Sequence, residues 1–262
     1  MSYSPNEPVA AELIHFADSL ADASRQLIRT RYRQKPLVEM KSDDTPVTAT
    51  DRDVETAIRE LIVRRYPGHG MIGEEHAASG RDAEWVWVVD PIDGTRSFVA
   101  GRPMFGTLIA LTRNARPVLG VVDMPMLGER WIGASGHATT FNGENAQSRA
   151  CAAFAGAILL TTSPEYLTGT AAASFANVAK EVQITIYDAG TQAYGLIASG
   201  LVDIVIAASY GIVDYLAAVP VIEGAGGAIC DWDGRPLDLH SGDRFVAVGD
   251  ASMLPATLQL LR

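Results

Sequence analysis

The 262-residue chain is predicted to be an α/β protein whose two halves differ in pattern. In the first half, two helical stretches precede short strands separated by tight turns, which predicts two helices against an antiparallel sheet. In the second half, strands and helices alternate, which favours a second, smaller α/β sheet. An Ala-rich stretch near residues 145–156 separates the two patterns. We therefore expect an N-terminal unit over residues 1–147 and a C-terminal unit over residues 148–262.

The first half opens with an amphipathic helix over residues 8–33. A short strand over residues 37–40 and a polar loop over residues 41–51 come next. Thr48 or Thr50 is expected to cap the second helix. The buried face of that helix consists of Val54, Ala57, Ile58, Leu61 and Ile62. Further strands are predicted over residues 71–73, 85–89, 105–113 and 117–124, with two more within residues 129–142.

The second half is predicted to alternate regularly. Strands are expected over residues 157–161, 183–187, 203–206, 228–231 and 245–248. Helices are expected over about residues 170–180, 190–199, 214–225 and 252–261.

Composition narrows the class of protein and its partners. The net charge is 21 − 31 = −10, which makes nucleic acid an unexpected partner. Two cysteines, Cys151 and Cys230, indicate no disulfide framework and fit a reducing compartment. The first residues lack the basic and apolar regions of a signal peptide, and no apolar run reaches the roughly 18 residues of a membrane span. We expect a soluble cytoplasmic protein.

The central motif is Asp90-Pro91-Ile92-Asp93-Gly94-Thr95, which follows the apolar strand over residues 85–89. Pro91 and Gly94 predict a turn that carries two carboxylates, and carboxylate oxygens suit hard cations such as Mg²⁺. If a helix begins at Thr95, its free N–H groups would face an anion. A metal beside an anion-binding turn points to phosphate-ester chemistry. The alternative is an ordinary turn with two solvated acids.

Other acidic residues stand at the ends of predicted elements. Glu74 follows a strand, Asp51 lies near a helix start, and Asp214 is expected to begin a helix. If these acids meet Asp90 and Asp93 in one cleft, cations must lie between them. Two metal ions can activate a water and stabilise a leaving oxygen. Taken singly, Asp214 fits a helix cap, and Glu74 with Glu75 fits a solvated pair.

The order of these motifs resembles the inositol monophosphatase family of metal-dependent phosphatases. The matching segments are Thr45–Asp51, Ile72–Glu75, Trp87–Thr95, and Asp214 with Glu223–Gly227. Within the family, the segments Ser97–Pro103, Phe105–Leu111 and Asp231–Leu237 are most similar to the histidinol-phosphatase branch.

The resemblance implies a layered α-β-α-β-α sandwich, a homodimer, two or three Mg²⁺ ions and inhibition by Li⁺. The implied metal ligands are the side chains of Glu74, Asp90, Asp93 and Asp214, with Asp90 bridging two ions, and the carbonyl of Ile92. Thr95, oriented by Asp51, would help Glu74 to position and deprotonate the attacking water. The N–H groups of Gly94 and Thr95 would bind the phosphate. Lys41, Asp93, Thr191 and the positions of Gly190 and Ala207 would face the phosphate or the substrate.

The substrate-recognition positions depart from the family pattern. Relatives usually carry a Glu where this chain has Ala207, and the histidinol branch usually has an Asp where it has Gly190. An aromatic residue that often precedes the metal Asp is here Val213. Either the pocket takes a less cationic leaving group, or Asp188 and Thr191 substitute for the lost acids.

Three functions follow from these observations. The first is Mg²⁺-dependent hydrolysis of histidinol phosphate to histidinol and phosphate. The second is the same chemistry on an inositol phosphate or another small polyol phosphate. The third is a non-catalytic regulator that binds metal or phosphate, although such a protein does not need the water-positioning residues Thr95 and Asp51. The polar, Pro-containing loop over residues 41–50 is compatible with a mobile segment over the site, but the sequence leaves open whether it closes.

Overall fold

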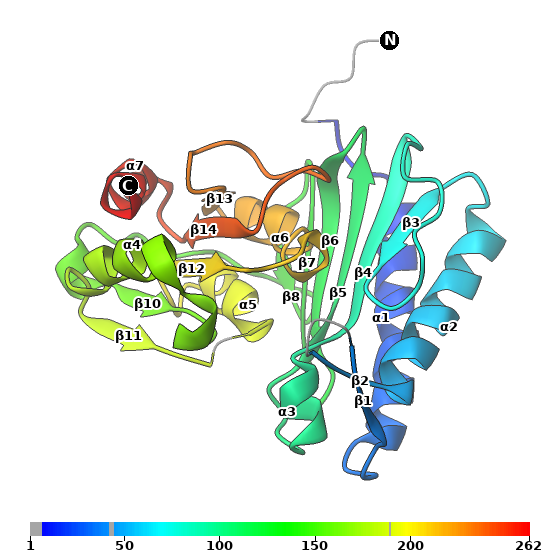
Figure 1. Ribbon diagram of the computed structural model, residues 1–262. Coiled ribbons are helices and arrows are strands. Elements are labelled where there is room, and N and C mark those ends of the chain that lie inside the picture. The colour runs from blue at the N-terminus through cyan, green and yellow to red at the C-terminus, as the bar shows by residue number, and fades with distance from the viewer. Residues whose placement is uncertain (1–6, 42–44, 189) are drawn as a thin grey trace.

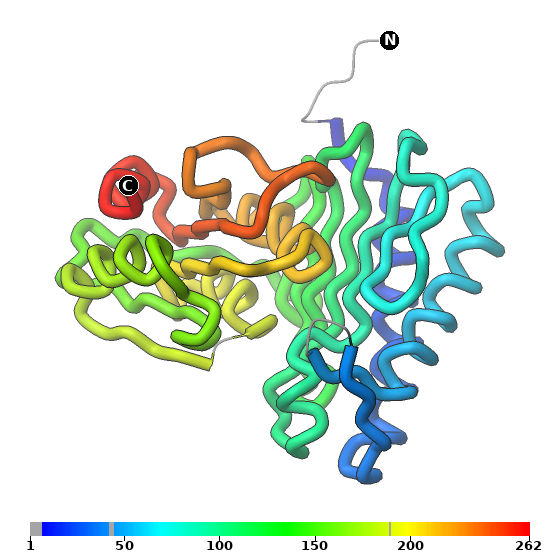
Figure 2. The backbone as a smooth tube through the Cα atoms, in the orientation of Figure 1, coloured from blue at the N-terminus to red at the C-terminus, as the bar shows by residue number. Residues whose placement is uncertain are grey.

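The computed structural model, which describes residues 7–41, 45–188 and 190–262, has five alternating layers of helix and sheet (Figure 1). Two helices cover the outer face of a seven-stranded sheet, two more lie between this sheet and a five-stranded sheet, and the last two cover the far side. In that order the helices are α1 (Ala11–Arg31) and α2 (Ala49–Arg65), α5 (Gln192–Ala198) and α6 (Ala218–Gly224), and α4 (Gly169–Ala179) and α7 (Leu254–Leu261). The predicted layered sandwich is confirmed, and Figure 2 shows α7 at the opposite end of the molecule from α1 and α2.

The seven-stranded sheet has the order β3-β4-β5-β6-β7-β8-β9. Its strands are β3 (Gly70–Gly73), β4 (Trp85–Asp93), β5 (Gly106–Arg113), β6 (Arg116–Met124), β7 (Glu129–Ala134), β8 (Thr140–Phe141) and β9 (Glu144–Asn145). All neighbours are antiparallel except β3 and β4, which are parallel with Gly73 opposite Val89. Because of this register, Glu74, which directly follows β3, lies level with Asp90 on the neighbouring strand β4.

Helices α1 and α2 pack on one face of this sheet through an apolar core that includes Leu20, Ile58 and Trp87. Thr48 is the cap of α2, as one of the two predicted alternatives has it. The polar loop predicted over residues 41–51 is wrong in part, because Pro46–Thr48 forms strand β2, antiparallel to β1 (Val38–Met40). A ladder of three residues is too short to leave a periodic signal in the sequence. Residues 42–44 of the loop whose mobility the sequence leaves open lie outside the described residues.

The five-stranded sheet has the order β11-β10-β12-β14-β13, and its strands confirm those predicted. They are β10 (Ile158–Leu160), β11 (Ile184–Ile186), β12 (Ile204–Ala208), β13 (Ala228–Cys230) and β14 (Arg244–Val248). Strand β10 is parallel to β11 and β12, whereas β14 is antiparallel to both of its neighbours. One apolar cluster contains buried residues of both sheets and of the helices between them. The division of the chain at residue 147 stays a prediction.

Two glycines let the segment around α6 lie directly on the seven-stranded sheet. A β-carbon at Gly120 would lie 1.9 Å from the carbonyl oxygen of Ala217, and one at Gly133 would lie 2.3 Å from that of Pro220. Neither approach leaves room for a side chain. The spacing between this sheet and the middle helical layer is therefore set by these glycines.

Two expectations near the motifs are wrong. Asp214 does not begin a helix: it ends a 3₁₀ turn over Ile212–Asp214, and α6 begins at Ala218. The Asp214 carboxylate accepts the N–H of Gly211 at 2.7 Å, so it closes its own turn. Likewise, Pro91 does not end its strand, because β4 continues to Asp93 through an irregularity in its pairing with β5. Proline is tolerated at such a β-bulge.

No helix in the described parts of the chain is long and apolar enough to cross a membrane.

Candidate active site

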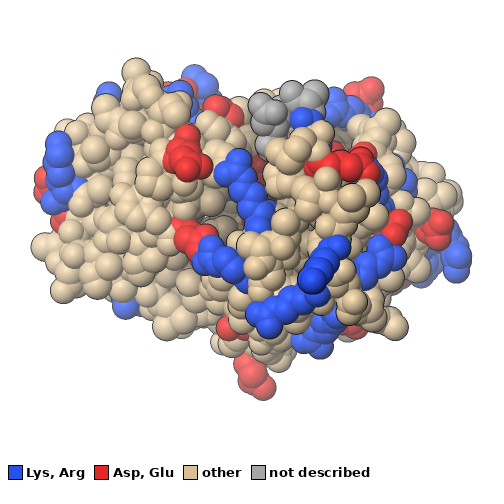
Figure 3. Space-filling view, turned by 60° about the horizontal axis from the view of Figure 1, so that its bottom comes forward, with Lys and Arg blue, Asp and Glu red and all other residues tan. Residues whose placement is uncertain are grey.

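A cleft of about 400 Å³ opens where the first-half strands meet the second-half turns. From the first half it is lined by the end of β4 and by α3 (Thr95–Val99), and from the second half by Tyr166, Tyr210 and Asp214. Figure 3 looks onto the lower face of the molecule, which is hollowed near its centre and carries acidic and basic side chains around the hollow.

Three carboxylates converge at the closed end of this cleft. Oxygens of Asp90, Asp93 and Asp214 all lie within 4.8 Å of one another. Glu74 also lines the cleft and comes from the adjacent parallel strand. Segments that are far apart in sequence therefore bring together the four carboxylates that the resemblance implied as metal ligands. The carbonyl-bearing residue Ile92 lines the same cleft.

These carboxylates are electrostatically unstable by themselves. Burial, followed by the charges of Glu74, Asp93 and Asp214, raises the pKa of Asp90 well above its usual range. Burial and then the charge of Asp93 raise the pKa of Asp214 to about 8, and burial raises the pKa of Asp93 to about 6. Within the described residues, no Lys or Arg forms an ion pair with Asp90, Asp93 or Asp214. A cluster of oxygen donors without its own counter-charge fits a hard divalent cation.

Lys41 lies at the edge of this cluster. Its Nζ is 2.8 Å from Glu74 Oε1 and 2.7 Å from Glu75 Oε1. Burial opposes the charge on Lys41, but the two glutamates outweigh it and raise the pKa of the ammonium. The N–H of Glu75 donates to buried Glu55 at 2.7 Å, which fixes the chain that carries both glutamates. Lys41 therefore holds Glu74 in place rather than lining the cleft.

Thr95 and Asp51 are joined beside the carboxylates. Thr95 Oγ1 lies 3.2 Å from Asp51 Oδ1 and 3.1 Å from the carbonyl oxygen of Ile92, and it donates to these acceptors. Asp51 Oδ2 in turn accepts from the N–H of Thr48 at 3.0 Å and from its hydroxyl at 2.5 Å. Burial raises the pKa of Asp51, and these hydrogen bonds oppose the rise. The Asp51 carboxylate, which is held by Thr48, therefore fixes the position of the Thr95 hydroxyl beside Ile92.

The turn after Asp93 requires a glycine at its first position. Gly94 has φ = 91°, in the left-handed region, and it is the N-cap residue of α3. A β-carbon there would lie 3.2 Å from both the carbonyl oxygen of Met104 and the Phe105 side chain. Only glycine adopts this backbone readily. A helix does begin at Thr95, which the sequence left as a condition.

The residues expected to face the substrate have three different positions. Gly190 lines the cleft. Thr191 is buried, and its hydroxyl donates to Asp93 Oδ2. Ala207 is buried within β12 opposite Phe245 and is not among the residues that line the cleft. Asp188 does line the mouth, where it forms an ion pair with Arg102.

The sequence did not predict most of the side chains that line the cleft besides the acids, among them Arg96, Tyr166 and Tyr210. Arg96 lies over the ring of Tyr166, with its guanidinium carbon 5.7 Å from the ring centre. The hydroxyl of Tyr210 is hydrogen-bonded to that of Thr162. The position of Arg96, one residue after the Asp93–Thr95 turn, was a usable signal, whereas the tyrosines come from separate loops and carried none.

Comparison with known proteins assigns the chain to a family. A model of the inositol monophosphatase family matches residues 10–261. The chain is 44% identical over 270 residues to the chloroplastic bifunctional phosphatase IMPL2 of Arabidopsis thaliana, covering 98% of this chain and 78% of the relative. It is 33% identical over 246 residues to a histidinol-phosphatase of Chlorobaculum parvum, covering 91% and 92%. A solved inositol monophosphatase from Zymomonas mobilis superimposes with a TM-score of 0.88 at 37% identity, covering 96% and 98%.

The layered fold and the acidic cleft thus define a metal-dependent phosphatase. The chain belongs to the inositol monophosphatase family, and it is a phosphoric monoester hydrolase.

Proposed function

We propose that the protein hydrolyses histidinol phosphate to histidinol and phosphate, with Mg²⁺ as its metal. The observation that carries the reaction type is the convergence of Asp90, Asp93 and Asp214 beside Thr95. For the substrate, support comes from the similarity to a bifunctional phosphatase and to histidinol-phosphatases. An inositol phosphate or other polyol phosphate is the alternative, favoured by the similarity to an inositol monophosphatase and by the missing acids at Gly190 and Ala207.

The four clustered carboxylates and the carbonyl of Ile92 would hold the metal ions. When bound, Mg²⁺ supplies positive charge that offsets the carboxylates, polarises the phosphate and acidifies a water. The hydroxyl of Thr95 can accept a hydrogen bond from that water, because its own proton is directed at Asp51 and Ile92. Glu74 is the nearby carboxylate that can take a proton from the water. The backbone N–H groups at Gly94 and Thr95 stand where a helix start favours an anion.

A panel of phosphate esters tests whether histidinol or a polyol is the leaving group. Phosphate release with Mg²⁺ is measured on histidinol phosphate, inositol 1-phosphate, glycerol 2-phosphate and nucleoside monophosphates. A clear preference for histidinol phosphate supports the proposal, and preference for inositol 1-phosphate favours the alternative. Removal of Mg²⁺ with a chelator should abolish release on every ester, and added Mg²⁺ should restore it.

Asp188 is the residue we propose for the amine of histidinol. It is half-exposed, so replacing it should weaken binding only moderately, with a rise in KM of about threefold to tenfold for Asp188→Asn. The matched control is Glu165→Gln, which removes the same charge from an exposed side chain that pairs with the cleft residue Arg96 but does not itself line the cleft. An equal KM in the Asp188 variant and the control contradicts this role. The implied homodimer is likewise a proposal, to be tested by sedimentation.

A further inference from the structure

Strand β4 contains a β-bulge at the metal-ligand loop. It pairs regularly with β5 as far as Asp90, which lies opposite Leu108, but the next pair is Asp93 with Gly106. Two residues of β4, Pro91 and Ile92, therefore face one residue of β5. That single residue is Thr107. An extra residue on one strand in this way is the definition of a β-bulge.

The bulge explains why both aspartates reach one cluster. In a regular strand successive side chains point to opposite faces, so residues three apart point away from each other. One extra residue reverses the second half of the strand. Asp93 then points to the same side as Asp90, and both reach the oxygens of Asp214. The shape of the metal site thus depends on the bulge staying in register.

A buried chain of hydroxyls links this bulge to helix α1. Thr107 Oγ1 donates to the carbonyl oxygen of Pro91 at 2.9 Å. Thr107 Oγ1 also lies 2.6 Å from Ser24 Oγ of α1. A threonine hydroxyl has one proton, and that proton is committed to Pro91, so Ser24 is the donor to Thr107. Both side chains are fully buried, so neither hydroxyl can exchange its partner for bulk water.

We propose that Thr107 and Ser24 are positioning residues that hold the bulge, and through it the two aspartates, in the geometry that binds metal. The proposal rests on the metal-binding part of the proposed function, but not on the identity of the substrate. It assigns to helix α1, which contributes no side chain to the cleft, a direct part in setting the site. Groups that orient metal ligands in this way typically change metal affinity by about ten- to a hundredfold when lost.

The chain offers a matched control for this role. Thr112 also lies on β5, is fully buried, and donates to a β4 carbonyl, that of Val86, at 3.1 Å. It stands at the far end of the ladder from the ligands. Thr107→Val and Thr112→Val therefore remove the same kind of hydrogen bond from the same pair of strands. If both threonines have a purely structural role, the two substitutions should have equal effects on Mg²⁺ affinity.

The experiment is titration of the full-length chain with Mg²⁺ by calorimetry, together with thermal unfolding and amide hydrogen exchange without metal. Thr107→Val should weaken Mg²⁺ binding about tenfold and speed exchange of the amides over residues 92–94. Thr107→Ser keeps the hydroxyl and should restore binding to within about twofold of the unmodified protein, since the bond to Pro91 is kept. Thr112→Val should lower the unfolding temperature alone. Ser24→Ala, which leaves the bond from Thr107 to Pro91 in place, should weaken binding less than Thr107→Val.

Equal Mg²⁺ affinity in Thr107→Val and Thr112→Val would overturn the proposal, as would a failure of Thr107→Ser to restore binding. If Thr107→Val does not fold, Ser24→Ala and Thr107→Ser decide between the two outcomes. Should the unmodified protein bind no Mg²⁺, the metal assignment of the proposed function fails. Exchange over residues 92–94 in the metal-free variants still tests the positioning role. If the protein binds Mg²⁺ but shows no preference for histidinol phosphate, the proposed substrate is wrong and the positioning role of Thr107 and Ser24 is unaffected.

Discussion

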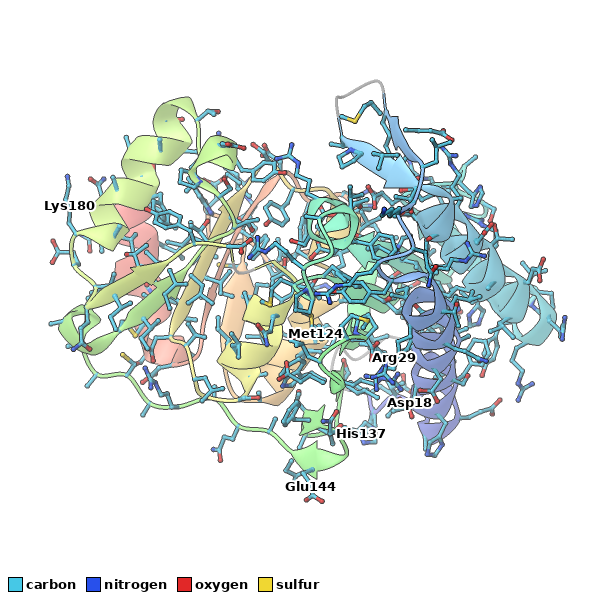
Figure 4. All side chains as sticks on the ribbon, turned by 90° about the horizontal axis from the view of Figure 1, so that it is seen from below. Asp18, Arg29, Met124, His137, Glu144 and Lys180 are labelled. Carbon is cyan, nitrogen blue, oxygen red and sulfur yellow. The ribbon has the colours of Figure 1, made fainter. Side chains whose placement is uncertain are left out.

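The chain buries carboxylates in two kinds of place, and their surroundings differ in one respect. At the first, on β6, the buried carboxylate of Asp123 accepts from Arg25 and from Arg130, whose Nε is 2.6 Å away. Arg130 is also paired with Asp18 and Asp22 of α1. Figure 4 labels Asp18 and Arg29 on this helix, beside the end of β6 at Met124. The second place is the cleft, where Asp90, Asp93 and Asp214 lie together without an arginine or lysine partner among the described residues.

The difference separates an acid that stabilises the fold from one that awaits a ligand. Burial opposes the charge of Arg130, but the surrounding carboxylates, led by Asp123, raise the pKa of its guanidinium. That cluster is complete within the chain. In the cleft the same burial raises the pKa values of Asp90 and Asp214 instead, because neighbouring carboxylates add to the negative charge and no Lys or Arg of the described residues pairs with them. Counter-charge, rather than burial, marks the functional acids here.

The sharpest way to break this comparison is to neutralise one acid in each place. Asp214→Asn should reduce turnover by about a thousandfold or more, because a clustered metal ligand is lost. Asp123→Asn should leave turnover nearly unchanged and lower the free energy of unfolding by about 3 kcal/mol, since buried Arg130 and half-buried Arg25 lose the carboxylate that they share. Steady-state kinetics and denaturant unfolding on both variants check this. Unchanged activity in Asp214→Asn would remove it from the metal site.

A smaller effect separates metal binding from water positioning within the cleft. Thr95→Ala removes the hydroxyl that lies between Asp51 and Ile92 but no carboxylate. We expect kcat to fall by about a hundredfold, while the Kd for Mg²⁺ stays within about threefold. Kinetics with saturating Mg²⁺ and calorimetric titration give the two quantities. A loss of Mg²⁺ affinity as large as the loss of kcat contradicts this division of roles.

The smallest effect is on the pH dependence of the free energy of unfolding. Its sign should differ between carboxylates that have an arginine partner and the carboxylates of the cleft. Folding raises the pKa of Asp93 to about 6 and that of Asp214 to about 8, so the folded state holds more protons than the unfolded state. The free energy of unfolding of the metal-free protein should therefore decrease as pH rises from about 4, where the unfolded carboxyls titrate, to about 8. Denaturant unfolding at several pH values measures it, and excess Mg²⁺ should suppress the decrease.

Asp203 provides the opposite sign in the same protein. Although burial opposes the change, Arg149 and the N–H of Ile158 lower the pKa of this carboxyl. Its contribution to stability is present above its unfolded pKa and is lost as pH falls through the folded value. Asp214→Asn should flatten the dependence near pH 8 and leave the acid limb intact. A metal-free protein equally stable from pH 5 to 9 would contradict the cleft electrostatics.

The strands of the second half and the acidic motif were predictable because both rest on local patterns, whereas the layered sandwich and the metal-ligand set were implied by the resemblance to the inositol monophosphatase family, and the ligand set stays a prediction. Strands such as β10 and β12 are short apolar runs between turns, and the motif around Asp90 is contiguous. What failed depended on tertiary contacts. The turn expected at Pro91 became a bulge, because β5 continues alongside it. The helix expected from Asp214 begins four residues later, because the carboxylate of Asp214 closes its own turn on Gly211.

The mouth of the cleft was largely hidden from sequence reasoning for the same reason. Tyr166 and Tyr210 come from loops of the second half, and their meeting with Arg96 of α3 depends on how the two sheets are stacked. No periodicity encodes that stacking. Thr191 was expected to face the substrate, yet its hydroxyl donates to Asp93. The sequence correctly indicated a polar side chain at Thr191, but it did not indicate that its hydrogen-bond partner is Asp93.

Gly120 and Gly133 have a consequence for engineering this protein. Replacing glycine by alanine in regular strands is a common route to thermal tolerance, because it reduces the freedom of the unfolded chain. Here a methyl group at either position would push against the backbone of residues 217–221. That segment follows Asp214 by only a few residues, so displacing it would draw one carboxylate away from the other three. A library that replaces strand glycines to gain stability is therefore expected to lose catalytic activity at Gly120 and Gly133.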